Sequence, residues 1–193
     1  MSRSRWVVAL ALFFGLALPA EVAALPILVI DQHNDAFPAT NGFGFGASPL
    51  GQEFTPSLTG LDAVEILIGP RDAATLAVVN VRKDSIAGQV VGTSLPGTFE
   101  ASVIHFDFAA LVALVPGDRY VIEPVLISGL GFGLVFSDTD TYSGGRGIVS
   151  GNLLPTRDMG FREGLTVPEP ATLSLLGIGL AFVAGRVARR RVI

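Results

Sequence analysis

The chain has 193 residues, of which 50% are hydrophobic, 16% are charged and none is cysteine, and its formal net charge is −4 at pH 7. The absence of cysteine excludes disulfide bonds, a thiol nucleophile and a cysteine-ligated metal. Residues 25–166 contain fifteen Asp and Glu against seven Lys and Arg, an excess of eight negative charges. Phosphate backbones repel so acidic a region, and nucleic acid is therefore not expected as a partner.

The first 24 residues have the pattern of a secretory signal peptide. Two arginines precede an uninterrupted apolar run at residues 6–18, and residues 22–24 place small side chains where signal peptidase reads them. We predict export through the Sec machinery and removal of residues 1–24 by signal peptidase. Cleavage after Ala20 is the alternative, which is disfavoured because Leu18 would then occupy a position that prefers a small side chain.

Residues 25–152 are predicted to form one domain of the all-β class, a β-sandwich. The apolar segments are short and rich in Val, Ile, Phe and Thr, and Gly, Pro and Asp residues separate them. We expect strands at residues 61–68, 75–81, 89–93, 98–108, 119–127 and 130–136. Residues 109–115 are interpreted as a strand that enters the turn at residues 116–118, rather than as a helix.

Alternation within residues 98–108 gives that strand two different faces. Ile104, Phe106 and Phe108 share one face, whereas His105 and Asp107 lie on the other. A histidine and an aspartate two residues apart can ligate a metal, but a solvent-facing pair on a half-exposed strand is the favoured interpretation.

Two further segments have an expected structural role. Residues 41–46 alternate glycine and phenylalanine, and we favour phenylalanines that fill the core over phenylalanines that form an adhesive tip. Residues 153–166 are predicted to hold the last strand, around residues 159–162, followed by a linker.

The order of short motifs along the domain resembles a jelly-roll module that is common in bacterial surface proteins. The matching segments are residues 52–55, 64–68, 76–81, 106–108, 115–120 and 142–145. The resemblance implies a jelly-roll-like sandwich. Modules of this shape often bind carbohydrate, but the matching residues are turn and core residues and carry no activity with them.

Asp138, Asp140 and Tyr142 form the main candidate for a ligand-binding loop. Their oxygen atoms stand beside the flexible pair Gly144 and Gly145. Calcium is one candidate ligand, although two carboxylates fall short of the roughly six to eight oxygens that the ion needs. A sugar is another, stacked on Tyr142 and hydrogen-bonded to the carboxylates. A purely structural turn is the favoured interpretation, and no metal or cofactor is otherwise expected.

No catalytic residue is expected in the domain. The chain lacks a serine nucleophile elbow, a phosphate-binding loop and a zinc signature. Glu65, Glu100, Asp107 and Glu123 could supply the acid and base of a glycosidase, but the sequence does not place two of them at the required separation. We therefore interpret the domain as non-enzymatic.

The C-terminal residues 167–193 combine three features in a fixed order. Pro168, Glu169 and Pro170 come first, an uncharged apolar run at residues 171–185 follows, and Arg186, Arg189, Arg190 and Arg191 come last. The run is short but apolar enough to insert as a single transmembrane helix. The positive-inside rule keeps the arginines cytoplasmic and leaves the domain outside.

This order resembles the PEP-CTERM sorting signal of Gram-negative bacteria. The resemblance implies that an exosortase, a membrane-embedded cysteine protease or transpeptidase, recognises residues 168–170 while the arginines retain the tail. The chain would be anchored transiently in the inner membrane and then reach the cell surface or the extracellular matrix. Substrates of this kind are associated with exopolysaccharide, biofilm and floc formation.

Two functions of different classes follow from these features. The first is a structural or carbohydrate-binding component of the extracellular matrix, with exopolysaccharide as a partner. The second is an extracellular polysaccharide hydrolase. A third arrangement, in which the tail is never cut, would leave a periplasmic domain anchored in the inner membrane.

Overall fold

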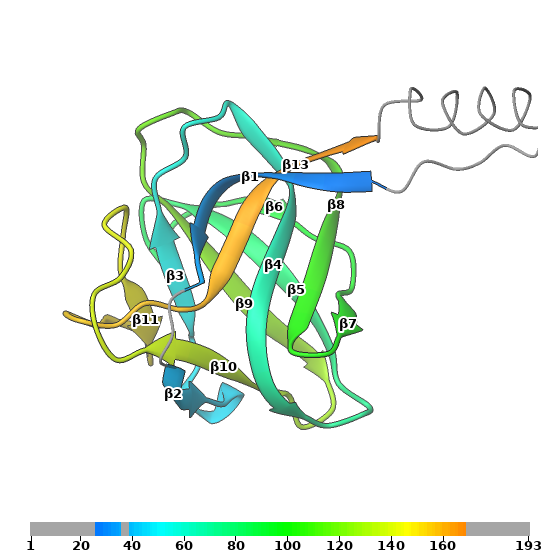
Figure 1. Ribbon diagram of the computed structural model, residues 1–193, viewed down its shortest axis with the longest axis vertical. Coiled ribbons are helices and arrows are strands. Elements are labelled where there is room, and N and C mark those ends of the chain that lie inside the picture. The colour runs from blue at the N-terminus through cyan, green and yellow to red at the C-terminus, as the bar shows by residue number, and fades with distance from the viewer. Residues whose placement is uncertain (1–25, 36–38, 169–193) are drawn as a thin grey trace, which may run out of the picture. The chain divides into compact units, whose positions relative to one another are not determined.

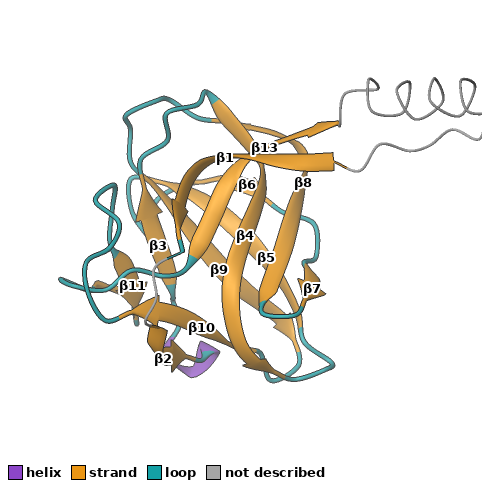
Figure 2. Cartoon of the chain, in the orientation of Figure 1, coloured by secondary structure: helices purple, strands orange, loops and turns teal. Residues whose placement is uncertain are grey.

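The computed structural model describes residues 26–35 and 39–168, and the predicted signal peptide, apolar run and arginine cluster lie outside the described residues. By their contacts, residues 28–167 form one compact unit, and residues 1–27 and 168–193 are assigned to a second. The first unit is almost entirely strand, with one short 3-10 helix, η1 (Phe45–Ala47), as Figure 2 shows. Among the described residues, no helix is long and apolar enough to cross a membrane.

The strands form two antiparallel sheets (Figure 1). In the seven-stranded sheet, β4 (Gly60–Arg71) pairs with β8 (Val103–Ala113), β13 (Phe161–Pro168) and β10 (Phe132–Ser137), and these continue to β7 (Thr98–Glu100), β1 (Pro26–Asn34) and β2 (Ala39–Phe43), respectively. The six-stranded sheet has the order β12 (Asn152–Leu153), β11 (Gly147–Val149), β3 (Gly51–Phe54), β9 (Tyr120–Ser128), β5 (Leu76–Lys83) and β6 (Val90–Thr93).

A hydrophobic core joins the two sheets. Ile66 and Phe106 of the first sheet and Val79 and Ile122 of the second belong to the same buried cluster, and all four are 0% exposed. Two sheets that bury their facing side chains in one cluster form a β-sandwich. The predicted all-β class is therefore confirmed, whereas the more specific jelly-roll architecture stays a prediction.

The predicted strands are present, with one interruption. The segment expected at residues 98–108 is divided into β7 and β8, and Ala101 between them has a positive φ of 47°. Phe106 is buried and Asp107 is exposed, as the alternation predicted. Strand β8 continues to Ala113 and a turn follows, in which Gly117 adopts a φ of 85° that glycine tolerates best.

The phenylalanines of the glycine and phenylalanine segment are partly buried and pack against the core. Phe43 packs edge-to-face on Phe136 with ring centroids 5.2 Å apart, and Phe45 packs in the same way on Phe132 at 5.0 Å. Edge-to-face contacts of this kind add stability beyond the buried area alone.

Strand β13 corrects the prediction of a linker before the sorting motif. The last strand extends over Phe161–Pro168, further along the chain than residues 159–162, and lies between β1 and β4. Phe161 pairs with Ile66 and is fully buried. The backbone nitrogen of Thr166 donates to Oδ1 of Asp62 at 2.6 Å. The residues expected as a linker are thus held in the sheet.

Glu163 places an ionisable side chain in the buried part of this strand. Its side chain is 0% exposed, and neither carboxyl oxygen makes a hydrogen bond of normal geometry with a described residue, although Asp31 and the backbone of Gln32 lie beside it. Burial and the nearby charge of Asp31 raise the pKa of Glu163 to about 8. Asp31 itself keeps its charge because, against the effect of burial, hydrogen bonds from Ser57 and Leu58 hold its pKa below the ordinary value. Glu163 is therefore neutral in the fold at pH 7.

Replacement of Glu163 by glutamine should remove a pH-dependent loss of stability. Because its folded pKa of about 8 lies above the ordinary 4.5, the unfolded chain loses this proton first, and stability falls between those two pH values. We expect E163Q to be more stable than the wild type by about 5 kcal/mol well above pH 8 and about equally stable near pH 4.5. Urea unfolding across this pH range measures the difference.

The matched control is Glu65→Gln. Hydrogen bonding to His105 lowers the pKa of Glu65, so its carboxylate contributes stability that is present above pH 4.5 and lost as the pH falls. E65Q should therefore lose stability at neutral pH, where E163Q gains it. A difference between E163Q and the wild type that stays constant with pH would contradict this account of Glu163.

Candidate functional site

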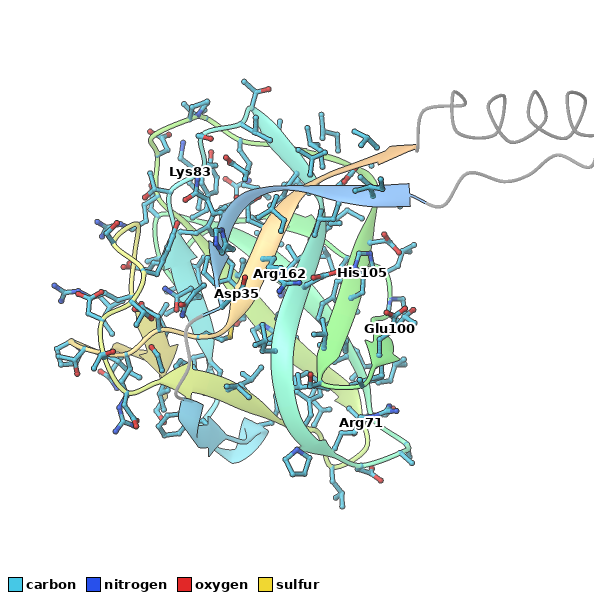
Figure 3. All side chains as sticks on the ribbon, in the orientation of Figure 1. Asp35, Arg71, Lys83, Glu100, His105 and Arg162 are labelled. Carbon is cyan, nitrogen blue, oxygen red and sulfur yellow. The ribbon has the colours of Figure 1, made fainter. Side chains whose placement is uncertain are left out.

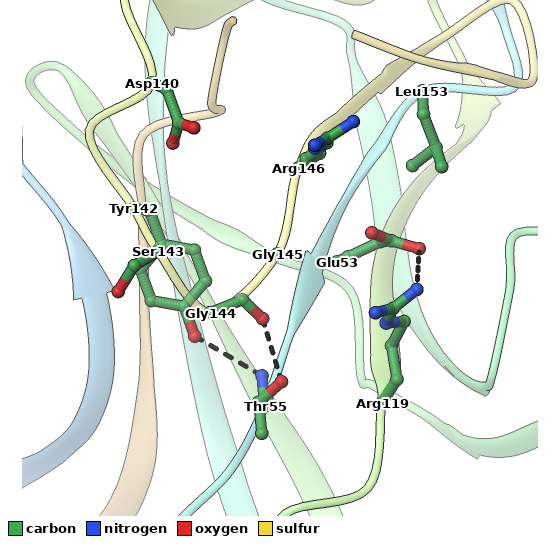
Figure 4. A pocket seen from close by; sticks show the side chains of 10 residues that line it. All are labelled: Glu53, Thr55, Arg119, Asp140, Tyr142, Ser143, Gly144, Gly145, Arg146 and Leu153. Atoms are coloured by element: carbon green, nitrogen blue, oxygen red, sulfur yellow. Dashed lines mark hydrogen bonds and ion pairs between the residues drawn. The ribbon is translucent and has the colours of Figure 1, made fainter. Parts of the chain in front are cut away.

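A polar pocket of about 460 Å³ lies beside the end of β3 and the loop between β10 and β11 (Figure 4). Its lining residues are Glu53, Thr55, Arg119, Asp140, Tyr142, Ser143, Gly144, Gly145, Arg146 and Leu153. A volume of this order is typical of small-molecule sites. The lining is more polar than in most such sites, which favours a ligand rich in hydrogen-bonding groups.

Charged side chains stand around the pocket. Arg119 places Nη1 at 3.6 Å from Oε1 of Glu53, a residue that is only 5% exposed. Arg146 and Asp140 form no ion pair with any described residue. Their guanidinium and carboxylate groups are therefore available for charge-assisted hydrogen bonds to a ligand.

The loop that forms one wall requires glycine. A Cβ atom on Gly144 would collide with the hydroxyl of Tyr142, and one on Gly145 would collide with the carbonyl oxygen of Glu53. Thr55 holds the loop in place, because its Oγ1 donates to the carbonyl of Gly144 at 2.8 Å and its backbone nitrogen donates to the Tyr142 hydroxyl at 3.3 Å. The loop at residues 142–145 therefore lies close against the end of β3, and this contact holds the wall of the pocket in place.

Asp158 anchors the same loop from the interior. It is 1% exposed, and its carboxylate accepts hydrogen bonds from the backbone nitrogens of Thr141 at 2.8 Å and Tyr142 at 3.0 Å. Nε2 of Gln52 donates to it at 3.1 Å, and Oε1 of Gln52 accepts from the backbone nitrogen of Met159 at 2.7 Å. The loop, β3 and the residues before β13 are therefore tied together by one buried network.

The structure brings together two of the three residues of the predicted ligand loop. Asp140 and Tyr142 line the pocket, whereas Asp138 lies 3.8 Å from Arg157. Tyr142 is only 8% exposed, and its ring packs edge-to-face on Phe161 at 5.2 Å, so little of the ring is free for stacking. Burial raises the pKa of Tyr142 to about 12. Among the described residues, no group of three or more His, Cys, Asp or Glu could hold a metal ion.

His105 and Asp107 belong to a chain of charges across the first sheet, of which Figure 3 labels His105, Arg162 and Asp35. His105 lies 3.0 Å from Asp107 through Nε2 and 3.3 Å from Glu65 through Nδ1. Arg162 bonds Glu65 at 3.3 Å and Asp35 at 2.9 Å. The hydrogen bond to Glu65 raises the pKa of His105 to about 9, so the ring is a cation at pH 7. A cationic imidazole is a poor metal ligand, which favours the interpretation as a structural ion pair.

Sequence reasoning did not single out Glu53, Arg119 and Arg146 as parts of one site. They come from distant segments that meet because β3 pairs with both β9 and β11, with Glu53 opposite Val121 and Gln52 opposite Gly147. Glu53 is the one signal in the sequence. It is a charged residue, and the strand in which it lies is buried at all four positions. A buried charge requires a partner, but the sequence does not identify which one.

Replacement of Asp158 by alanine should destabilise the domain by about 3 kcal/mol, because two backbone amides and the Gln52 amide would lose their buried acceptor. Urea unfolding provides the measurement. Asp140→Ala is the control on the same loop, because the Asp140 side chain is exposed at the pocket, and its loss should cost less than about 1 kcal/mol. Equal effects of the two variants would contradict the anchoring role of Asp158.

The predicted sorting residues begin where the described domain ends. Pro168 is the last residue of β13, while Glu169, Pro170 and the four C-terminal arginines lie outside the described residues. Comparison with curated proteins and with solved structures returned no significant match. The PEP-CTERM protein-sorting motif, however, matches residues 166–191 and so begins within β13. The chain therefore carries a PEP-CTERM protein-sorting motif, which identifies it as an exosortase substrate.

Proposed function

We propose that the protein is a non-enzymatic component of the cell surface or extracellular matrix, and that its sandwich binds exopolysaccharide in the pocket lined by Glu53 and Arg146. The observation that carries the proposal is the sorting motif at residues 166–191, which is joined directly to a folded domain. Export places this domain outside the inner membrane, and exosortase processing near residues 168–170 then releases it from its anchor.

The chemistry of the pocket supports a sugar ligand. Asp140 can accept hydrogen bonds from hydroxyl groups, and Arg146 and the hydroxyl of Ser143 can donate to ring and hydroxyl oxygens. Because the ring of Tyr142 is buried, hydrogen bonds rather than aromatic stacking would supply the affinity. The expected jelly-roll architecture supports the same assignment through analogy of shape alone.

The carboxylates considered for hydrolysis support a non-enzymatic role. A glycosidase needs a carboxylic acid whose pKa is raised, but contact with His105 lowers the pKa of Glu65. Glu123 is engaged by Arg82 at 2.7 Å and by Asn80 at 3.0 Å, in the other sheet. These contacts favour binding over turnover.

Exosortase processing should remove the C-terminal tail. Mass spectrometry of the C-terminal peptide, in membrane, surface and culture fractions of the native host, should find a new terminus near residues 168–170 in material outside the inner membrane. An intact terminus at Ile193 that is confined to the inner membrane would contradict the proposal. It would instead support an uncleaved periplasmic domain.

Removal of the unpaired pocket charges should weaken binding to exopolysaccharide from the host. We expect Asp140→Asn and Arg146→Ala each to lower the affinity about tenfold, because each removes a charge-assisted hydrogen bond. Affinity electrophoresis in gels that contain the polysaccharide measures this change.

Arg71→Ala is the matched control, because Arg71 stacks on Phe99 at 4.3 Å and does not line the pocket. Unchanged affinity in D140N and R146A would show that the pocket is not the binding site. Release of new reducing ends from the polysaccharide would instead favour a hydrolase.

A further inference from the structure

We propose that the end of the domain where β13 terminates rests on the membrane surface, through the exposed apolar side chains of Val29, Leu111 and Val167, while the C-terminal tail is held in the bilayer. These three residues are called the apolar end below. The inference goes beyond the proposed function and rests on its membrane-held tail.

The apolar end gathers residues from three strands, β1, β8 and β13. Because β4 is antiparallel to both β8 and β13, the start of β4 meets the ends of those two strands (Figure 1). A Cβ atom on Gly60 would lie 3.0 Å from Cγ of Leu111, and Thr166 bonds Asp62 at 2.6 Å. A Cβ atom on Gly164 would collide with the carbonyl oxygen of Val29. The three apolar residues thus lie around the start of β4.

These side chains are exposed although they are apolar. Leu111 is 60% exposed, Val29 is 47% exposed and Val167 is 39% exposed. Ile30, beside Val29, is 42% exposed. Apolar side chains of this kind gain free energy when they enter the boundary between headgroups and acyl chains.

The short segment between β13 and the apolar run indicates that the bilayer is the surface that covers these side chains. Strand β13 ends at Pro168, and the uncharged apolar run begins at residue 171. Three residues span at most about 11 Å. The end of β13 must therefore stay close to the headgroups for as long as the tail is inserted.

The opposite end of the domain lies too far from the tethered end of β13 to rest on the same membrane surface. Strand β4 runs from Gly60 to Arg71, and eleven residue steps in a strand cover roughly 36 Å. Leu130 lies at that far end, because its backbone nitrogen bonds the carboxylate of Asp72, which follows β4 directly. At 89% exposure, Leu130 is an exposed apolar residue that the tether keeps away from the bilayer.

The chain contains no cysteine, so single cysteines can be introduced for labelling. Full-length variants Leu111→Cys, Val29→Cys and Leu130→Cys would carry an environment-sensitive dye in phosphatidylcholine nanodiscs, with nitroxide-labelled lipids as quenchers. Gly179→Cys, in the apolar run, reports insertion of the tail itself. A circular dichroism spectrum equal to that of the wild type confirms the fold of each variant.

We expect quenching at residues 111 and 29 to be at least threefold stronger than at residue 130, with strong quenching at residue 179. Strong quenching at residue 179 with equal quenching at residues 111 and 130 would overturn the orientation and leave the sorting proposal standing. Quenching at residue 111 that appears only with an exosortase present would also overturn it, in favour of a protein contact. Absence of quenching at residue 179 would overturn both proposals.

Discussion

The insertion of β13 between β1 and β4 is the constraint on which both the domain and its sorting signal depend. Phe161 completes the core opposite Ile66, and Gly164 lets β1 approach where any side chain would collide with Val29. The first sheet is therefore incomplete until the chain reaches the residues that immediately precede the motif. The sorting motif, which matches from residue 166 onward, therefore begins within a hydrogen-bonded strand of the domain.

The domain accommodates its buried carboxyl groups in two different ways. Asp158 accepts hydrogen bonds from three donors and fixes the loop that forms the pocket, whereas burial beside Asp31 keeps Glu163 neutral. Without disulfide bonds, such networks and the core between the sheets must supply the stability. On the outer face of the first sheet, charged side chains are paired with one another, and His105 and Arg162 alternate with carboxylates.

Local patterns in the sequence were sufficient to predict most strands, the two faces of β8 and the sorting motif, because each depends on neighbouring residues. The pocket could not be predicted, since Glu53, Arg119 and Arg146 meet only through pairing between distant strands. Stacking of a sugar on Tyr142 was one alternative for its loop, but Phe161 covers the ring from a segment that follows almost 20 residues later. The linker prediction was wrong because β13 continues to Pro168, and the tight contact of Gly164 with β1 requires a glycine within that strand.

Strand β13 is an integral part of the first sheet and is joined without a linker to the sorting motif. Hydrogen exchange measured by mass spectrometry on the full-length protein tests this arrangement. Amides of residues 161–164 should exchange as slowly as those of the paired residues 63–66 in β4. Exchange of residues 161–164 at the rate of an unstructured chain, beside a protected β4, would contradict it.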